Sequence, residues 1–113
     1  MPTAIARKLE NIRLKGALTN ADVANMLGLR PETISRWNQG HAFPHRDSEK
    51  ELLEIEYIVD ELSDFYDEPN DARLWLFARQ KLLNGERPAD LIQQSRTDEV
   101  LLIIKQLKEA VFI

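Results

Sequence analysis

Apolar residues recur every three or four positions along most of the chain, which is the spacing of one face of an α-helix. Residues 4–16 show this spacing first, with an apolar face formed by Ile5, Leu9 and Ile12. Gly16 then ends the segment. No stretch alternates convincingly between apolar and polar residues with the period of two that a half-buried strand requires. The pattern therefore predicts an all-α fold.

Helix-capping residues divide the segment that follows into two short helices. Thr19 and Asp22 have the spacing of a capping box, and Gly28 stands where the helix they begin should end. The next helix is bracketed by Pro31 at its first position and by Gly40 just past its last one. Two short helices separated by a tight turn have the layout of a helix-turn-helix.

The second half of the chain predicts one long helix and several shorter ones. Ser48 and Glu51 resemble another capping box, so we expect the long helix to begin there and to run to about residue 66. Its inner stripe consists of Leu52, Ile55, Val59, Leu62 and Phe65. Shorter helices are expected at residues 71–77, 88–94 and 97–109.

Charge is unevenly divided along the 113 residues. Residues 1–46 contain seven Lys or Arg and three acidic residues and carry +4, whereas residues 47–113 carry −8, which gives the net charge of −4. A basic segment on an acidic body suggests that one end of the molecule meets an anionic polymer. Accidental clustering of charges is the alternative explanation.

Composition excludes several classes of protein. The chain has no cysteine, so disulfide frameworks and thiolate chemistry are ruled out. It has no apolar run of membrane-spanning length and no signal-peptide core, so we expect a cytoplasmic protein. Its length fits one domain, or two small subdomains that share a core.

The second helix of the pair has a polar face suited to DNA. Ile34 and Trp37 lie three positions apart on its inner side, while the other side carries short or forked polar residues that can reach base edges and phosphates. Any amphipathic helix pair could show these faces. However, the small Ala24, the turn at Gly28 and the "ISRW" run make residues 4–46 resemble the Xre/Cro family of helix-turn-helix domains.

This resemblance implies a set of DNA-contacting residues: Asn20, Arg30, Pro31, Glu32, Thr33, Ser35, Arg36 and Gln39. Pro31, Glu32 and Thr33 would begin the recognition helix near the bases, and Asn20 and Gln39 would hold phosphates. Relatives often have a capping serine where this chain has Arg30, a side chain that can reach a phosphate or a guanine instead.

The second half contains "WL" at Trp75–Leu76, "LLNGERPADLI" at residues 82–92 and a closing apolar helix with a hydrophobic tail. In these features it resembles the toxin-binding domain of Xre/MbcA/ParS antitoxins. With the first half, the resemblance spans nearly the whole chain. It divides the chain into a DNA-binding domain (residues 1–46), a connecting or dimerisation helix (47–68) and a toxin-binding domain (69–113).

The family resemblance implies an antitoxin that blocks the active site of a cognate toxin of the RES-domain type, an NAD-degrading enzyme. It also implies a homodimer that represses its own operon by binding operator DNA. The alternative is a stand-alone Xre-type regulator whose second half serves only dimerisation or effector binding. A neighbouring toxin gene would distinguish the two.

The chain ends on Val111, Phe112 and Ile113. Burial of each of these apolar side chains stabilises the buried state by about 1.5–3 kcal/mol. Folding back onto the core is the simpler outcome for these side chains. We instead expect the tail to enter the toxin's active-site cleft, with Phe112 as its anchor. The predicted toxin-binding residues are Lys108, Ala110, Val111, Phe112 and Ile113.

Other candidate sites are weaker. His41 and His45 have a spacing seen in zinc sites but lack further ligands, so a loop role after the recognition helix is preferred. The acids between Glu49 and Asp71 are interpreted as a solvated helix surface, and Trp75 as a core anchor. No catalytic residues, cofactor or metal are predicted, and an enzyme is not expected.

Overall fold

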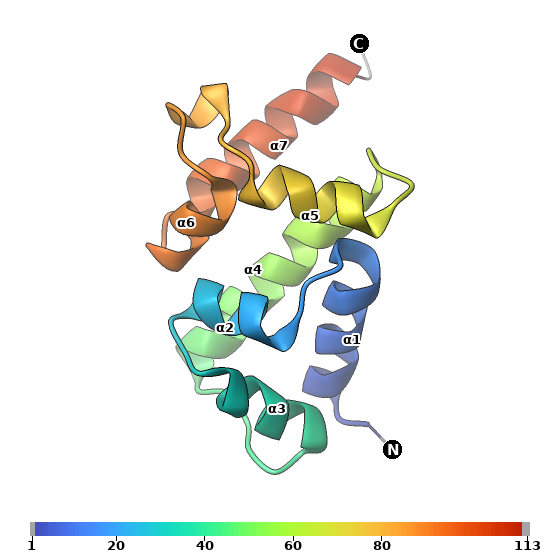
Figure 1. Ribbon diagram of the computed structural model, residues 1–113, viewed down its shortest axis with the longest axis vertical. Coiled ribbons are helices and arrows are strands. Elements are labelled where there is room, and N and C mark those ends of the chain that lie inside the picture. The colour runs from blue at the N-terminus through green and yellow to red at the C-terminus, as the bar shows by residue number, and fades with distance from the viewer. Residues whose placement is uncertain (1, 112–113) are drawn as a thin grey trace.

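Seven α-helices and a short 3-10 helix make up the regular structure of residues 2–111, the residues that the computed structural model describes (Figure 1). They are α1 (Ala4–Gly16), α2 (Asn20–Leu27), α3 (Pro31–Gln39), α4 (Arg46–Ser63), α5 (Pro69–Phe77), η1 (Lys81–Leu83), α6 (Pro88–Gln93) and α7 (Thr97–Val111). The body measures 45 × 26 × 21 Å. The predicted all-α fold is confirmed.

The start and stop signals of the helix-turn-helix lie where the sequence predicts them. Thr19 and Asp22 form a complete capping box, in which each side chain accepts a hydrogen bond from the other residue's backbone N–H. Gly28 follows α2 with a φ of 69°, a left-handed conformation that glycine adopts without steric cost. Pro31 is the first residue of α3, and Gly40 caps its end. The tight turn between α2 and α3 is therefore encoded locally.

The predicted start of the long helix is wrong. α4 begins at Arg46 with His45 as its N-cap, so Ser48 already lies within the first turn and makes no capping box with Glu51. The backbone N–H of Glu49 donates to the carbonyl of His45 at 2.8 Å, which is a helical bond three residues upstream of the first predicted one. The helix also ends at Ser63 rather than near residue 66.

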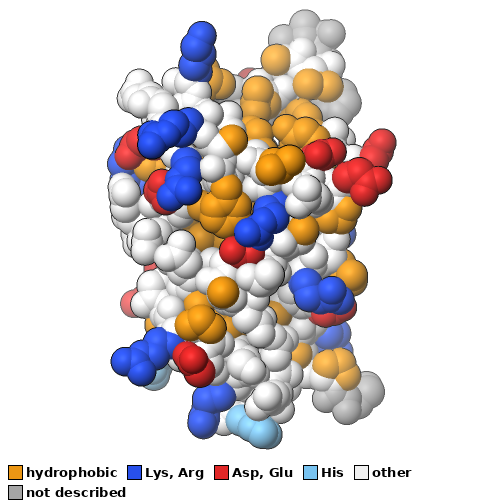
Figure 2. Space-filling model, viewed as in Figure 1, with side chains coloured by type: hydrophobic (Ala, Val, Ile, Leu, Met, Phe, Trp, Pro, Cys, Tyr) orange, Lys and Arg blue, Asp and Glu red, His pale blue; other side chains and the backbone are white. Residues whose placement is uncertain are grey.

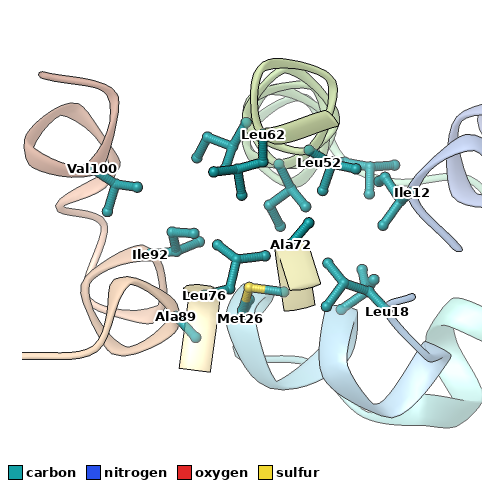
Figure 3. Packing of buried hydrophobic residues seen from close by; sticks show 14 of the residues in the cluster. Ile12, Leu18, Met26, Leu52, Leu62, Ala72, Leu76, Ala89, Ile92 and Val100 are labelled. Atoms are coloured by element: carbon teal, nitrogen blue, oxygen red, sulfur yellow. The ribbon is translucent and has the colours of Figure 1, made fainter. Parts of the chain in front are cut away.

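One cluster of buried side chains runs through the molecule (Figure 3). α4 supplies its central stripe, and the members that lie within the helix are fully buried: Leu52, Ile55, Ile58, Val59 and Leu62. Phe65 lies beyond the helix and is half-buried. Figure 3 shows Leu18 and Met26 from the first half beside Ala72 and Leu76 from the second. The two halves therefore share a core, while the division into three regions stays a prediction.

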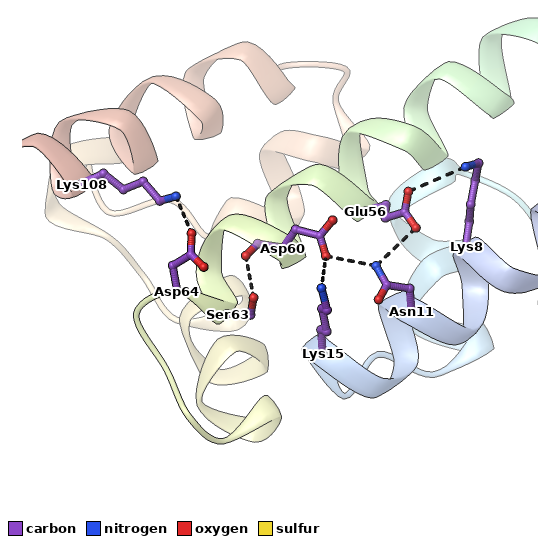
Figure 4. Close-up of polar contacts among 8 residues, drawn as sticks. All are labelled: Lys8, Asn11, Lys15, Glu56, Asp60, Ser63, Asp64 and Lys108. Carbon is purple, nitrogen blue, oxygen red and sulfur yellow. Dashed lines mark hydrogen bonds and ion pairs between the residues drawn. The ribbon is translucent and has the colours of Figure 1, made fainter.

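α1 packs closely along α4. A Cβ added at Gly16 would lie only 3.0 Å from both methyl groups of Val59, so a larger residue would force the two helices apart. Polar bonds border the same contact in Figure 4: Lys8 pairs with Glu56, Lys15 pairs with Asp60, and Asn11 donates to both carboxylates. These acids join two helices, so the interpretation of the acids between Glu49 and Asp71 as a solvated surface does not hold for Glu56 and Asp60.

The two tryptophans differ in burial. Trp37 of α3 is 3% exposed and belongs to the core, as predicted. Trp75 of α5 is half-buried and packs against the edge of that core. The prediction of a core anchor at Trp75 is therefore correct only for part of its ring system.

Candidate functional site

α3 lies at one end of the long axis (Figure 1). Its polar face is exposed. Ile34 and Trp37 are buried beneath it. The predicted DNA-contacting residues of this region divide by exposure: Arg30, Pro31, Glu32, Arg36 and Gln39 are exposed, and Thr33 and Ser35 are half-buried. Arg30 is the N-cap residue, and its side chain makes no capping hydrogen bond, so it is free to extend.

Asn20 begins α2 and lies beside the second half of α3. Its side-chain oxygen accepts a hydrogen bond from the Nδ2 of Asn38 at 3.1 Å, and both residues are exposed. Sequence reasoning missed Asn38, because it lies one turn after the buried Ile34, beside the inner side of α3 and away from the residues of its polar face. The bond fixes the orientation of the Asn20 amide, so its NH₂ group can be aimed at a phosphate.

The basic excess of residues 1–46 is concentrated near this end of the molecule. Three of the seven cations form ion pairs, because Lys8, Arg13 and Lys15 lie against Glu56, Glu10 and Asp60. The others make no ion pair within residues 2–111: Arg7, Arg30, Arg36 and Arg46. Figure 2 shows His side chains beside Lys or Arg at the end that holds α3, while further Lys and Arg side chains lie higher on the same face, mostly beside acidic ones. This distribution favours an anionic ligand there.

The opposite end of the molecule is formed by the last turns of α7 (Figure 1). Val100, Ile103 and Ile104 are buried, whereas Ala110 and Val111 are exposed, Val111 to 60%. Val111 therefore does not fold back onto the core. Of the predicted toxin-binding residues, Phe112 and Ile113 lie outside the described residues.

The side chain of Lys108 is partly buried, which the sequence did not predict. Its ammonium group donates to the carboxylate of Glu61 and, at 2.7 Å, to that of Asp64, both at the end of α4. Figure 4 shows the bond to Asp64. Its charge is thus already compensated within the chain. The contact ties the last turns of α7 to the end of α4, and the predicted role of Lys108 in toxin binding stays a prediction.

The histidines and acids that were weighed as metal ligands or acid–base groups do not come together as a site within residues 2–111. Among residues 2–111, no group of three or more His, Asp or Glu could hold a metal ion, and His41 and His45 are both exposed loop residues beside α3. No helix in that range is long and apolar enough to cross a membrane. Burial raises the pKa of Glu51, as do the neighbouring charges of Glu54 and Asp47, but these side chains line only an open surface hollow.

Comparison with known proteins finds no matching family model. The mycobacterial cidal antitoxin MbcA of Mycobacterium tuberculosis is 32% identical over 97 residues, which covers 85% of this chain and 84% of that protein. The same figures apply to MbcA of Mycobacterium bovis. A second M. tuberculosis protein, described as a probable mycobacterial cidal antitoxin, is 30% identical over 105 residues, with 88% and 89% coverage.

A solved structure agrees with these relatives. A chain in the crystal structure of the M. tuberculosis MbcT–MbcA toxin–antitoxin complex superposes with a TM-score of 0.82 at 27% identity. The match covers 98% of this chain and 99% of that one. The similarity thus includes both ends of the molecule, α3 and α7.

Proposed function

We propose that this chain, which belongs to the MbcA family of antitoxins, neutralises a cognate toxin by filling its active-site cleft with the end of α7. The structural similarity to a chain of a toxin–antitoxin complex supports a toxin partner. We take that toxin to be a RES-domain enzyme that degrades NAD, as the family resemblance implies, and place both proteins in the cytoplasm. The chain itself acts as an inhibitor and not as an enzyme.

The exposure of Val111 carries this proposal. The core is already closed by Val100, Ile103 and Ile104, and Val111 lies exposed outside it. A pocket in a partner would remove apolar side chains at this end from water, which is worth about 1.5–3 kcal/mol for each large side chain. Lys108 holds the last turns in a fixed direction and so lowers the entropy lost on binding.

The α3 end supports the second part of the proposal, repression of the antitoxin's own operon. Exposed Arg30 and Arg36, with the oriented Asn20, form a face that can bind phosphates and base edges. A homodimer would place two copies of α3 on half-sites about 34 Å apart or a multiple of that distance. The similarity to a chain of a toxin complex favours this combined role over that of a regulator without a toxin.

Deletion of residues 111–113 tests the mechanism. The truncated chain should keep its melting temperature, because Val111 is exposed, but should no longer protect cells or preserve NAD when the toxin is co-expressed. The matched control replaces the exposed Leu14 of α1, far from α7, with serine and should protect fully. Full protection by the truncated chain would contradict the proposal.

A further inference from the structure

One side of α4 carries a stripe of side chains that are not part of the hydrophobic core. Six residues at helical spacing lie on this side of the helix, from its first turn to its C-cap: Arg46, Lys50, Leu53, Tyr57, Glu61 and Asp64. Leu53 and Tyr57 are 40% and 55% exposed although they are large and apolar. The groove between α4 and α7 continues the stripe, because Leu101 of α7 lines two adjoining hollows with Tyr57.

The charges of this stripe are ordered along the helix. Arg46 and Lys50 lie at its start and make no ion pair within residues 2–111, the apolar pair lies in the middle, and the acids lie at the end. Glu61 and Asp64 share the cation of Lys108, and Lys105 and Glu109 line the hollow beside them, so three acids and two cations leave this end with a net charge of −1. Glu49 and Glu54 line the same groove from the two flanks of the stripe.

Two copies of this stripe are complementary in charge when they lie antiparallel to each other. If a second copy lies antiparallel, with the two-fold axis near Ile55, Leu53 faces the partner's Tyr57. Lys50 then faces the partner's Glu61, and Arg46 faces the partner's Asp64. Every charged pair is made twice, as two-fold symmetry requires, and the helix dipoles oppose each other favourably. A parallel arrangement would instead bring like charges together.

From this self-complementarity we propose that the α4 stripe, with Leu101 beside it, is the surface through which two copies of the chain associate. The contact would follow the helix for about 27 Å, since eighteen steps separate Arg46 from Asp64 at about 1.5 Å each. The apolar centre supplies the affinity, and the charges at both ends set the antiparallel register. The inference deepens the homodimer of the proposed function by assigning its surface, and it concerns the antitoxin without its toxin.

The first test measures the mass of the free full-length chain by analytical ultracentrifugation. Wild type should sediment as a dimer, and Leu53→Glu or Tyr57→Glu should weaken association at least about a hundredfold, since each places two carboxylates at the apolar centre. Leu14→Glu, equally exposed on α1, should remain dimeric. Circular dichroism checks that each variant is folded. A monomeric wild type, or dimers that survive both stripe substitutions, would overturn the proposal.

The second test determines the relative orientation of the two α4 helices and needs no variant that disrupts the dimer. The chain has no native cysteine, so Leu53→Cys and Tyr57→Cys chains can be mixed and oxidised without side reactions. A disulfide requires Cα atoms within about 7 Å, so the antiparallel register favours links between the two different variants. Predominant links between identical variants would reject this register. Toxin protection, measured separately, tests the proposed function and not this interface.

Discussion

Arg73 of α5 donates two hydrogen bonds to the carboxylate of Asp22, the same carboxylate that accepts the backbone N–H of Thr19 at the start of α2. The guanidinium also donates to the carbonyl of Ala17 at 3.2 Å and stacks 4.9 Å from the centre of the Phe77 ring. A single side chain of the second half therefore holds the cap of the helix-turn-helix in place.

This arrangement predicts that Asp22→Ala destabilises the whole chain and not only α2. The substitution removes a cap and leaves Arg73 without its partner, so we expect a loss of about 1–3 kcal/mol in the free energy of unfolding, measured with urea. The exposed Asp67, substituted in the same way, is the control and should lose less than about 0.5 kcal/mol. Equal effects would show that the Arg73 contact contributes nothing.

The same pair predicts a pH dependence. Burial raises the pKa of Asp22, but hydrogen bonds from Arg73 and Thr19 outweigh it, so the pKa lies below its usual value. The contribution of Asp22 is therefore complete above the unfolded-state pKa of about 4 and is lost as the pH falls through the lower folded-state value. Wild type and Asp22→Asn should differ most at neutral pH and converge in strong acid, as followed by urea unfolding.

Lys108→Ala should impair toxin neutralisation without removing the tail. The substitution frees the end of α7 from α4 and leaves Glu61 and Asp64 without their shared cation. We expect weaker toxin binding, measured by calorimetry, and a stability loss of about 1–2 kcal/mol. The control is Lys105→Ala on the same helix, an exposed residue without an ion pair in residues 2–111. Unchanged toxin affinity in Lys108→Ala would count against a positioning role.

The two tryptophans should respond differently to truncation. Trp37→Ala removes a side chain that is 3% exposed, and we expect a loss of about 3–5 kcal/mol. Trp75→Ala should cost clearly less, because part of that ring system is already in contact with water. Thermal unfolding of both variants provides the comparison, and a larger loss at Trp75 would contradict the burial described above.

Operator binding should depend on Arg30 and Arg36. If each contacts a phosphate, replacement by alanine lowers the slope of log affinity against log salt by about 1 for each residue. Arg13→Ala is the matched control, since this arginine is paired with Glu10 and should leave the slope unchanged. Promoter binding by an Arg30/Arg36 double alanine variant that equals wild type would reject α3 as the recognition helix.

Local signals were sufficient to predict the helix-turn-helix. Thr19, Asp22, Gly28, Pro31 and Gly40 each act on neighbouring residues, so their effects can be read from the sequence. The start of α4 was mispredicted because Ser48 and Glu51 have the right spacing for a capping box, but the chain has already become helical at Arg46. A capping motif has no effect once the preceding residues have adopted helical dihedrals.

Contacts between distant residues could not be predicted in this way. Arg73 meets Asp22 across 51 positions, and Lys108 meets Glu61 across 47. Neither pair leaves a periodic pattern, because each depends on how α5 and α7 pack against the first half. For the same reason, the sequence did not predict that the ammonium group of Lys108 is directed toward α4, and the contact of Lys108 with the toxin stays a prediction.

The separation of α3 from the end of α7 along a 45 Å axis restricts how the two ends can influence each other. At physiological ionic strength, electrostatic interactions between exposed charges are screened within about 8 Å. If a toxin binds at α7 and operator DNA at α3, as proposed, exposed charges at the α7 end are screened from operator phosphates at the α3 end. An effect of toxin binding on repression would then have to be transmitted by packed helices and bonds such as Arg73–Asp22. Alternatively, toxin binding could change the number of chains assembled on the DNA.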